Sequence, residues 1–126
     1  MVDVQKVEDG FKKLVEVINK NPKAKEILKA WLKGYHGRVH NYQIGSKEFH
    51  IIFRPDGAGF GSGLYPAPDL TLKVDPDVWN DMIMGKVKTI GSGSLLEQGK
   101  LTIYGAANEI GILQKLAPAV GVVPLG

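Results

Sequence analysis

Apolar positions in the first third of the chain repeat with the period of an α-helix. The stripe predicts an amphipathic helix over residues 3–20 and is formed by Val4, Val7, Phe11, Leu14, Val15 and Ile18. Asn21-Pro22 then suits a helix cap followed by proline at the first helical position. A second stripe ends at Gly34. The pattern predicts two helices over residues 3–34, or one long helix kinked at Pro22.

From residue 38 onward the apolar period changes to two, which is typical of β-strands with one buried face. Gly45-Ser46 lies between two such runs and predicts a two-residue hairpin turn. That turn pairs Tyr42 with Phe49 and His40 with Ile51. The resulting register gathers the apolar side chains of both strands on one face of the sheet.

Strands and helices alternate through the rest of the chain. The pattern predicts strands over residues 58–64, 69–74 and 100–104, and helices over residues 75–84 and 106–117. Pro118 is expected to stop the closing helix, and an apolar tail follows over residues 118–126. The predicted fold class is therefore α+β: a five-stranded, mainly antiparallel sheet covered by helices over residues 38–117, in one domain spanning residues 1–126.

Length and composition narrow the class of protein. A chain of 126 residues suits one compact domain, and without cysteine it has no disulfide, thiolate metal site or cysteine nucleophile. No apolar run approaches the roughly 20 residues that cross a bilayer. The first residues lack a signal-peptide pattern, and Pro124-Leu125-Gly126 matches no targeting tail. We expect a cytoplasmic protein.

Positive charge is concentrated near the N-terminus. Residues 1–40 hold nine basic and five acidic side chains, whereas residues 41–126 hold seven and eight. A net charge of +3 is too small to indicate nucleic-acid binding. The basic side chains form either a solvated helix face or a patch that contacts an anionic membrane surface, through Lys12, Lys13, Lys20, Lys23 and Lys25.

Groups that could carry chemistry are scattered. His36 and His40 are too far apart on a strand to bind one metal ion, and the glycines of residues 57–63 are not followed by the helix that a phosphate loop needs. We expect no metal and no cofactor. Glu109 falls inside an apolar arc, where it either satisfies backbone amides in a first helical turn or contacts a ligand as a buried acid.

The second half of the chain carries a sequence of motifs in one order. The strand 69–74 leads to a helix that ends Met82-Ile83-Met84-Gly85-Lys86, and Gln98 later precedes Gly99-Lys100-Leu101-Thr102-Ile103-Tyr104-Gly105 and an apolar helix ending in Leu116. This order resembles the sterol carrier protein type 2 family over roughly residues 25–118. The resemblance implies an α+β domain that encloses an apolar tunnel for fatty acids, fatty acyl-CoA, sterols or other lipids.

Carried onto this chain, the resemblance places the tunnel along the helix 75–84, the strand 99–105 and the closing helix. Methionine side chains adapt to ligands of varied shape, which suits such a lining. The expected lipid-binding residues are Trp79, Met82, Ile83, Met84, Leu95, Gln98, Leu101, Ile103, Ile112, Leu113 and Leu116.

The sequence therefore predicts non-catalytic binding or transfer of a long-chain acyl, isoprenoid or sterol-like lipid. The alternative is an accessory module whose apolar groove binds a partner protein or an isoprenoid lipid in a biosynthetic complex. A third class, a small enzyme that uses Glu109 or His40, lacks an assembled nucleophile, base and orienting group.

Overall fold

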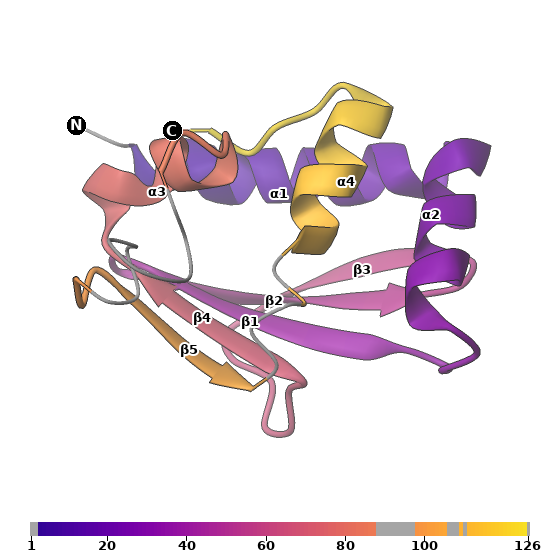
Figure 1. The fold of residues 1–126 in the computed structure, drawn as a ribbon, viewed down its shortest axis with the longest axis horizontal. Helices are drawn as coiled ribbons and strands as arrows, with labels where there is room; N and C mark the ends of the chain where they lie inside the picture. Colours follow the sequence, from indigo (N-terminus) through magenta and orange to yellow (C-terminus); the bar gives the residue numbers. More distant parts are fainter. Residues whose placement is uncertain (1–2, 88–97, 106–108, 110, 126) are drawn as a thin grey trace.

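The computed structural model of the chain describes residues 3–87, 98–105, 109 and 111–125. Its helices lie on one face of a single sheet (Figure 1). The helices are α1 (Val4–Asn19), α2 (Pro22–Leu32), α3 (Pro76–Ile83) and α4 (Gly111–Val120). The strands are β1 (Arg38–Ile44), β2 (Lys47–Arg54), β3 (Gly57–Ser62), β4 (Leu70–Val74) and β5 (Leu101–Gly105).

The strands run in the order β3-β2-β1-β4-β5 and leave the sheet open. Among the described strands, β1 and β4 are parallel and the other neighbouring pairs are antiparallel. The α+β class with a mainly antiparallel sheet is thus confirmed. The connection from β3 to β4 is held by the buried Asn41, whose side chain bonds both the backbone N–H and the carbonyl of Tyr65, at 2.8 and 2.9 Å.

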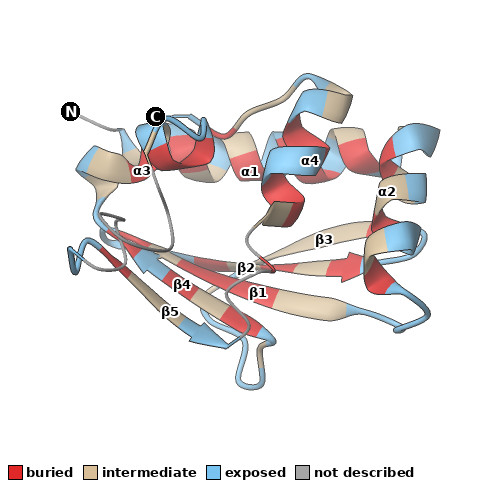
Figure 2. Ribbon diagram, viewed as in Figure 1, coloured by how far each residue is buried: buried red, intermediate tan, exposed pale blue. Residues whose placement is uncertain are grey.

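The predicted hairpin register is confirmed. Tyr42 pairs with Phe49 and His40 with Ile51 across β1 and β2. Because side chains alternate along a strand, this register turns His40 and Tyr42 toward the helices, and both are buried. Figure 2 shows buried residues recurring along β1, β2 and β4 under the helices.

The N-terminal pattern forms two helices. Asn21 caps α2, since its side-chain oxygen accepts a 3.0 Å hydrogen bond from the backbone N–H of Ala24, and Pro22 takes the first helical position. The apolar stripe of α1 is buried against the sheet. Phe11 lies at its centre, with its ring centroid 4.8 Å from those of Tyr42 and Phe49 and 5.6 Å from that of Trp79.

The closing helix differs from its predicted bounds. Pro118 was expected to stop it, but α4 continues to Val120. Proline removes one backbone donor, and so close to a helix end this loss does not prevent the helix from continuing through residues 119 and 120. The helix ends instead at Gly121, which has a φ of +72° and whose N–H bonds the carbonyl of Ala117. The predicted start at Ala106 lies outside the described residues.

The C-terminal tail packs back onto the first and third helices. The indole Nε1–H of Trp79 donates a 2.7 Å hydrogen bond to the carbonyl of Pro124. On α1, a Cβ added at Gly10 would come 2.7 Å from the Cα of Pro124. Gly10 therefore costs helix propensity in the middle of α1 but allows the tail to approach closely.

We expect Gly10→Ala to displace the tail. Alanine normally adds up to about 1 kcal/mol of stability at a helical glycine, but at this position its methyl group meets the backbone of Pro124. Hydrogen exchange of residues 121–125 should become faster, and the unfolding temperature should not rise. Gly111→Ala, at a position where the added Cβ meets no described atom within 4 Å, is the control. Equal stabilisation by both substitutions, with unchanged exchange, would contradict close packing of the tail.

Candidate functional site

A buried polar row runs from β1 toward α4. The Nδ1 atom of His40 lies 3.3 Å from the hydroxyl of Tyr42, and Nε2 lies 3.0 Å from Oε1 of Glu109. The Nη1 atom of Arg38 lies 3.3 Å from the same carboxylate oxygen. Among the described residues, the Glu109 carboxylate contacts two side chains of β1. The alternative from the sequence, in which Glu109 satisfies the backbone amides of its own helical turn, concerns neighbours outside the described residues.

Their surroundings shift the pKa values of Tyr42 and Glu109 in opposite directions. Burial raises the pKa of the Tyr42 phenol, and the negative charge of Glu109 raises it further. Burial alone would also raise the pKa of the Glu109 carboxyl. The hydrogen bonds and charges of His40 and Arg38 together outweigh this effect and lower that pKa. A His40 ring protonated at Nε2 accepts from the Tyr42 hydroxyl and donates to Glu109, so one tautomer satisfies both contacts.

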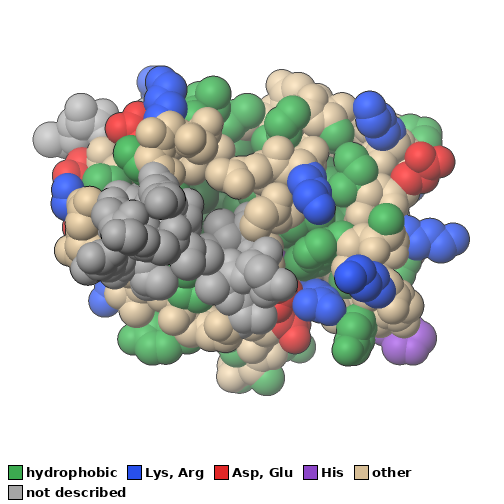
Figure 3. Space-filling view, viewed as in Figure 1, with side chains coloured by type: hydrophobic (Ala, Val, Ile, Leu, Met, Phe, Trp, Pro, Cys, Tyr) green, Lys and Arg blue, Asp and Glu red, His purple; other side chains and the backbone are tan. Residues whose placement is uncertain are grey.

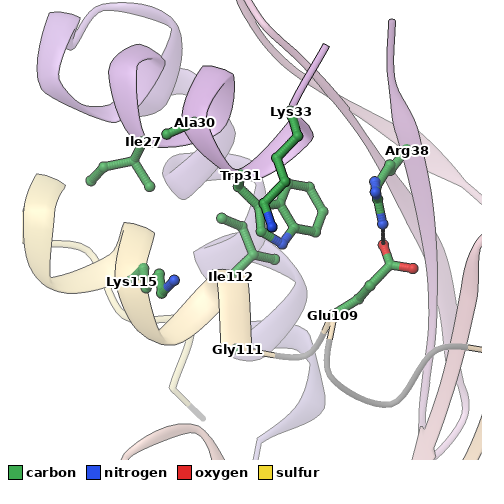
Figure 4. Close-up of a pocket in the computed structure, with 9 residues that line it drawn as sticks. All are labelled: Ile27, Ala30, Trp31, Lys33, Arg38, Glu109, Gly111, Ile112 and Lys115. Atoms are coloured by element: carbon green, nitrogen blue, oxygen red, sulfur yellow. Dashed lines mark ion pairs between the residues drawn. The ribbon is translucent and has the colours of Figure 1, made fainter. Parts of the chain in front are cut away.

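A pocket of about 550 Å³ opens above this row, between α2 and α4. Trp31 and Ile112 form apolar walls from the two helices, and Arg38 and Glu109 are joined at its sheet side (Figure 4). We call it the α2–α4 pocket; it is lined by Ile27, Ala30, Trp31, Lys33, Arg38, Glu109, Gly111, Ile112 and Lys115. On the face drawn in Figure 3, basic side chains surround hydrophobic ones on the right of the view, at the end of the molecule where α2 and α4 lie.

A second pocket, of about 410 Å³, lies between α3, α4 and the C-terminal tail. No charged side chain is among its described lining residues. Met84, the residue that follows α3, contributes a side chain that is 49% exposed. We call it the α3–α4 pocket; it is lined by Ile83, Met84, Gly85, Gln114, Ala117, Pro118 and Val123.

The expected lipid-binding residues are distributed between the core and these pockets. Several are buried in the core: Trp79, Met82, Ile83, Leu101, Ile112, Leu113 and Leu116. Ile103 is half-buried against that core, whereas Met84 and Gln98 are exposed. Leu95 lies outside the described residues. Ile83 and Met84 line the α3–α4 pocket and Ile112 lines the α2–α4 pocket, while a continuous tunnel stays a prediction.

Sequence reasoning missed the residues of the α2–α4 pocket contributed by α2 and β1. Trp31 belonged to the predicted apolar stripe of α2, but its ring is only half-buried and forms a pocket wall. Arg38 was counted only as part of the basic N-terminal region. The hairpin register carried the usable signal, because it put His40 on the same face as Tyr42 and so required a buried partner for the imidazole.

The Glu109 contacts predict a pH dependence of stability. A carboxyl group with a lowered folded-state pKa stabilises the fold above its unfolded pKa, about 4.3, and this contribution is lost as the pH falls through the folded pKa. Glu109→Gln should lower the free energy of unfolding by about 1.5–3 kcal/mol at neutral pH. Urea unfolding should show this difference shrinking below about pH 4. Glu16→Gln removes a half-exposed carboxylate and serves as control. A difference that does not change with pH would contradict this assignment.

The comparisons with known proteins come from both sequence and structure. The family model of the SCP-2 sterol transfer family matches residues 11–120. Comparison with curated protein sequences gives no match. The solved structures include a UbiJ-SCP2 ubiquinone synthesis protein, with a TM-score of 0.63 at 16% identity over 91% of each chain. They also include apo sterol carrier protein 2 from Yarrowia lipolytica, with a TM-score of 0.56 at 17% identity over 87% of this chain and 88% of that one.

A larger enzyme contains a similar fold. The sec-alkylsulfatase Pisa1 from Pseudomonas sp. gives a TM-score of 0.56 at 15% identity, but this chain spans 14% of its length. At these identities the solved structures establish the fold alone. Within the described residues, no helix is long and apolar enough to span a membrane. The family match covers most of the chain and agrees with the observed sheet and helices, so the chain belongs to the SCP-2 sterol transfer family, a family of lipid-binding domains.

Proposed function

We propose that this protein binds the hydrophobic chain of a long-chain acyl or isoprenoid-like lipid in the α3–α4 pocket and transfers it without chemical change. The observation that supports this most directly is the apolar lining of that pocket in a member of a lipid-transfer family. Its volume of about 410 Å³ falls within the range of small-molecule sites.

The side chains around the α3–α4 pocket suit a flexible apolar ligand. Met84 is half exposed, and its unbranched thioether adapts to ligands of different shape. Val123 brings the C-terminal tail into the wall, and the Trp79 bond to Pro124 holds that tail in place. Gln114 supplies a polar group, although its amide already donates a 3.4 Å hydrogen bond to the carbonyl of Met82.

The absence of charge among the described lining residues sets the expected selectivity. Each buried methylene of a ligand contributes about 0.8 kcal/mol, so affinity should rise with chain length until the pocket is full. The ligand's headgroup has no ionic partner in this lining. We therefore expect discrimination by chain length and shape rather than by headgroup charge at this pocket.

Filling the α3–α4 pocket should weaken lipid binding while leaving the fold intact. We expect Met84→Trp to displace about two to three methylenes of a bound chain, which corresponds to roughly 2 kcal/mol or about thirty-fold in Kd. The measurement is titration of delipidated protein with a fluorescent fatty acid. Leu64→Trp is the matched control, because Leu64 is also an exposed apolar residue, 41% exposed, but does not line the pocket.

Two results would contradict this proposal. One is the absence of saturable binding to the delipidated wild-type protein, in which case the accessory-module function would take its place. The other is equal affinity of Met84→Trp and Leu64→Trp at equal unfolding temperature.

We also propose that the basic N-terminal helices touch anionic membrane during transfer. The lysines expected to do so are not equivalent. Lys12 lies 3.7 Å from Glu8, and Lys13 and Lys20 both approach Glu16, at 3.9 and 3.6 Å. On α2, by contrast, Lys23 and Lys25 form no ion pair with a described residue. The charge available to a membrane is therefore greater on α2.

This difference predicts unequal effects on vesicle binding. Each lysine near an anionic surface contributes about 1 kcal/mol, so a Lys23→Gln, Lys25→Gln protein should bind anionic vesicles about thirty-fold more weakly. A Lys12→Gln, Lys13→Gln protein should lose less, because those ammonium groups have carboxylate neighbours. Vesicle co-sedimentation at increasing salt should weaken wild-type binding. Salt-insensitive binding, or a larger loss for the α1 pair, would refute the proposed contact.

A further inference from the structure

We propose that the α2–α4 pocket binds a phosphate monoester attached to an apolar group. The inference rests on the proposed function in one respect only, that the apolar group belongs to a lipid. The phosphate site itself is argued from the charges, rings and helix end that line this pocket. It is separate from the α3–α4 pocket, which uses other residues of α4.

The charges of the pocket do not balance without a ligand. Among the described lining residues, Lys33, Arg38 and Lys115 face one carboxylate, Glu109, so two positive charges are in excess when His40 is neutral. Glu109 already contacts Arg38 and the ring of His40. Lys33 and Lys115 form no ion pair with any described residue. A phosphate monoester carries about −1.5 to −2 charge at pH 7, which matches that excess.

The Arg38 side chain is preorganised to bind a phosphate. Its guanidinium lies 4.7 Å from the ring centroid of Tyr35 and 5.4 Å from that of Trp31. Its Nη1 atom contacts Glu109, and its side chain remains 24% exposed. The planar guanidinium presents five donors, so N–H groups remain for a second oxyanion. Because the rings and Glu109 already fix the side chain, binding costs little additional ordering.

The remaining walls favour an apolar group beside the phosphate. Trp31 and Ile112 face the pocket from opposite helices (Figure 4). Gly111, the first residue of α4, also lines the pocket, and the positive end of a helix dipole favours an anion there. The pocket therefore combines a cationic end with an apolar end, as an amphiphilic phosphate requires.

Isothermal titration with octyl phosphate tests the site on the whole protein. The Lys33→Asn, Lys115→Gln protein removes the two unpaired cations; asparagine is used because residue 33 has a φ of +51°. We expect its Kd for octyl phosphate to rise about tenfold or more for each lysine lost. The control is a Lys29→Gln, Lys73→Gln protein, which loses the same charge at exposed positions outside the pocket. Its Kd should change less than about twofold.

Two further ligands test the two halves of the assignment. Both are titrated into the Met84→Trp protein, in which the α3–α4 pocket is filled. Octyl glucoside keeps the chain without the anion, and inorganic phosphate keeps the anion without the chain; each should bind at least about tenfold more weakly than octyl phosphate. If inorganic phosphate binds as tightly as octyl phosphate, the pocket does not recognise the apolar group. If octyl glucoside binds as tightly as octyl phosphate, the pocket does not recognise the phosphate. Equal Kd values for the pocket variant and the control, with unchanged unfolding temperatures, would overturn the proposal as a whole.

Vesicles distinguish a membrane lipid from a dispersed one. Phosphatidic acid carries a phosphate monoester, so vesicles containing it are compared with phosphatidylserine vesicles of equal surface charge. If the pocket variant loses binding to phosphatidic acid vesicles but not to phosphatidylserine vesicles, the pocket binds the phosphate of a membrane lipid. If it loses only octyl phosphate binding, the pocket binds the phosphate of a dispersed lipid. The loss of octyl phosphate affinity caused by the Lys33→Asn, Lys115→Gln substitutions should be the same in a Met84→Trp background, so failure at the α3–α4 pocket and failure at this pocket give different results.

Discussion

Phe11 lies where α1, the first hairpin and α3 meet, and the rest of the structure depends on this contact. Its ring packs against Tyr42 of β1, Phe49 of β2 and Trp79 of α3. Burying such rings supplies much of the stabilisation of a small core. The described helices all cover one face of the sheet. On that face, α1 packs against both α3 and the C-terminal tail and so helps to position them. The tail crosses α1 at the residue before Phe11, where only glycine leaves room.

The second constraint is the buried carboxylate of Glu109, which ties the chain ahead of α4 to the first strand. A buried carboxylate is stable only with cationic or hydrogen-bonding partners, and here Arg38 and His40 provide them. The same contact shapes the α2–α4 pocket, because it holds the Arg38 guanidinium at the pocket's edge. Arg38 and Glu109 therefore satisfy one another's charge and also line the α2–α4 pocket, whereas His40 is buried beside them.

Local patterns were sufficient to predict most of the fold. The Gly45-Ser46 turn fixed the hairpin register, and Asn21-Pro22 fixed the start of α2, because turns and caps depend on residues close in sequence. The Glu109–His40 contact joins residues far apart in sequence, and no local pattern reports such a pairing. The packing of the tail on α1 escaped prediction for the same reason. The end of α4 depended on Gly121 rather than on the more conspicuous Pro118.

The expected lipid-binding residues are divided between core and pockets, because a sequence pattern does not distinguish these two environments. Apolar periodicity identifies side chains that leave water, and Trp79, Met82 and Leu116 do so by packing into the core. A ligand surface instead needs side chains that the fold leaves partly uncovered. Met84 at the end of α3 and Trp31 on α2 meet this condition, since each is apolar, partly exposed and next to α4. Partial exposure is a property of packing between elements, so it appears only when the helices have been placed on the sheet.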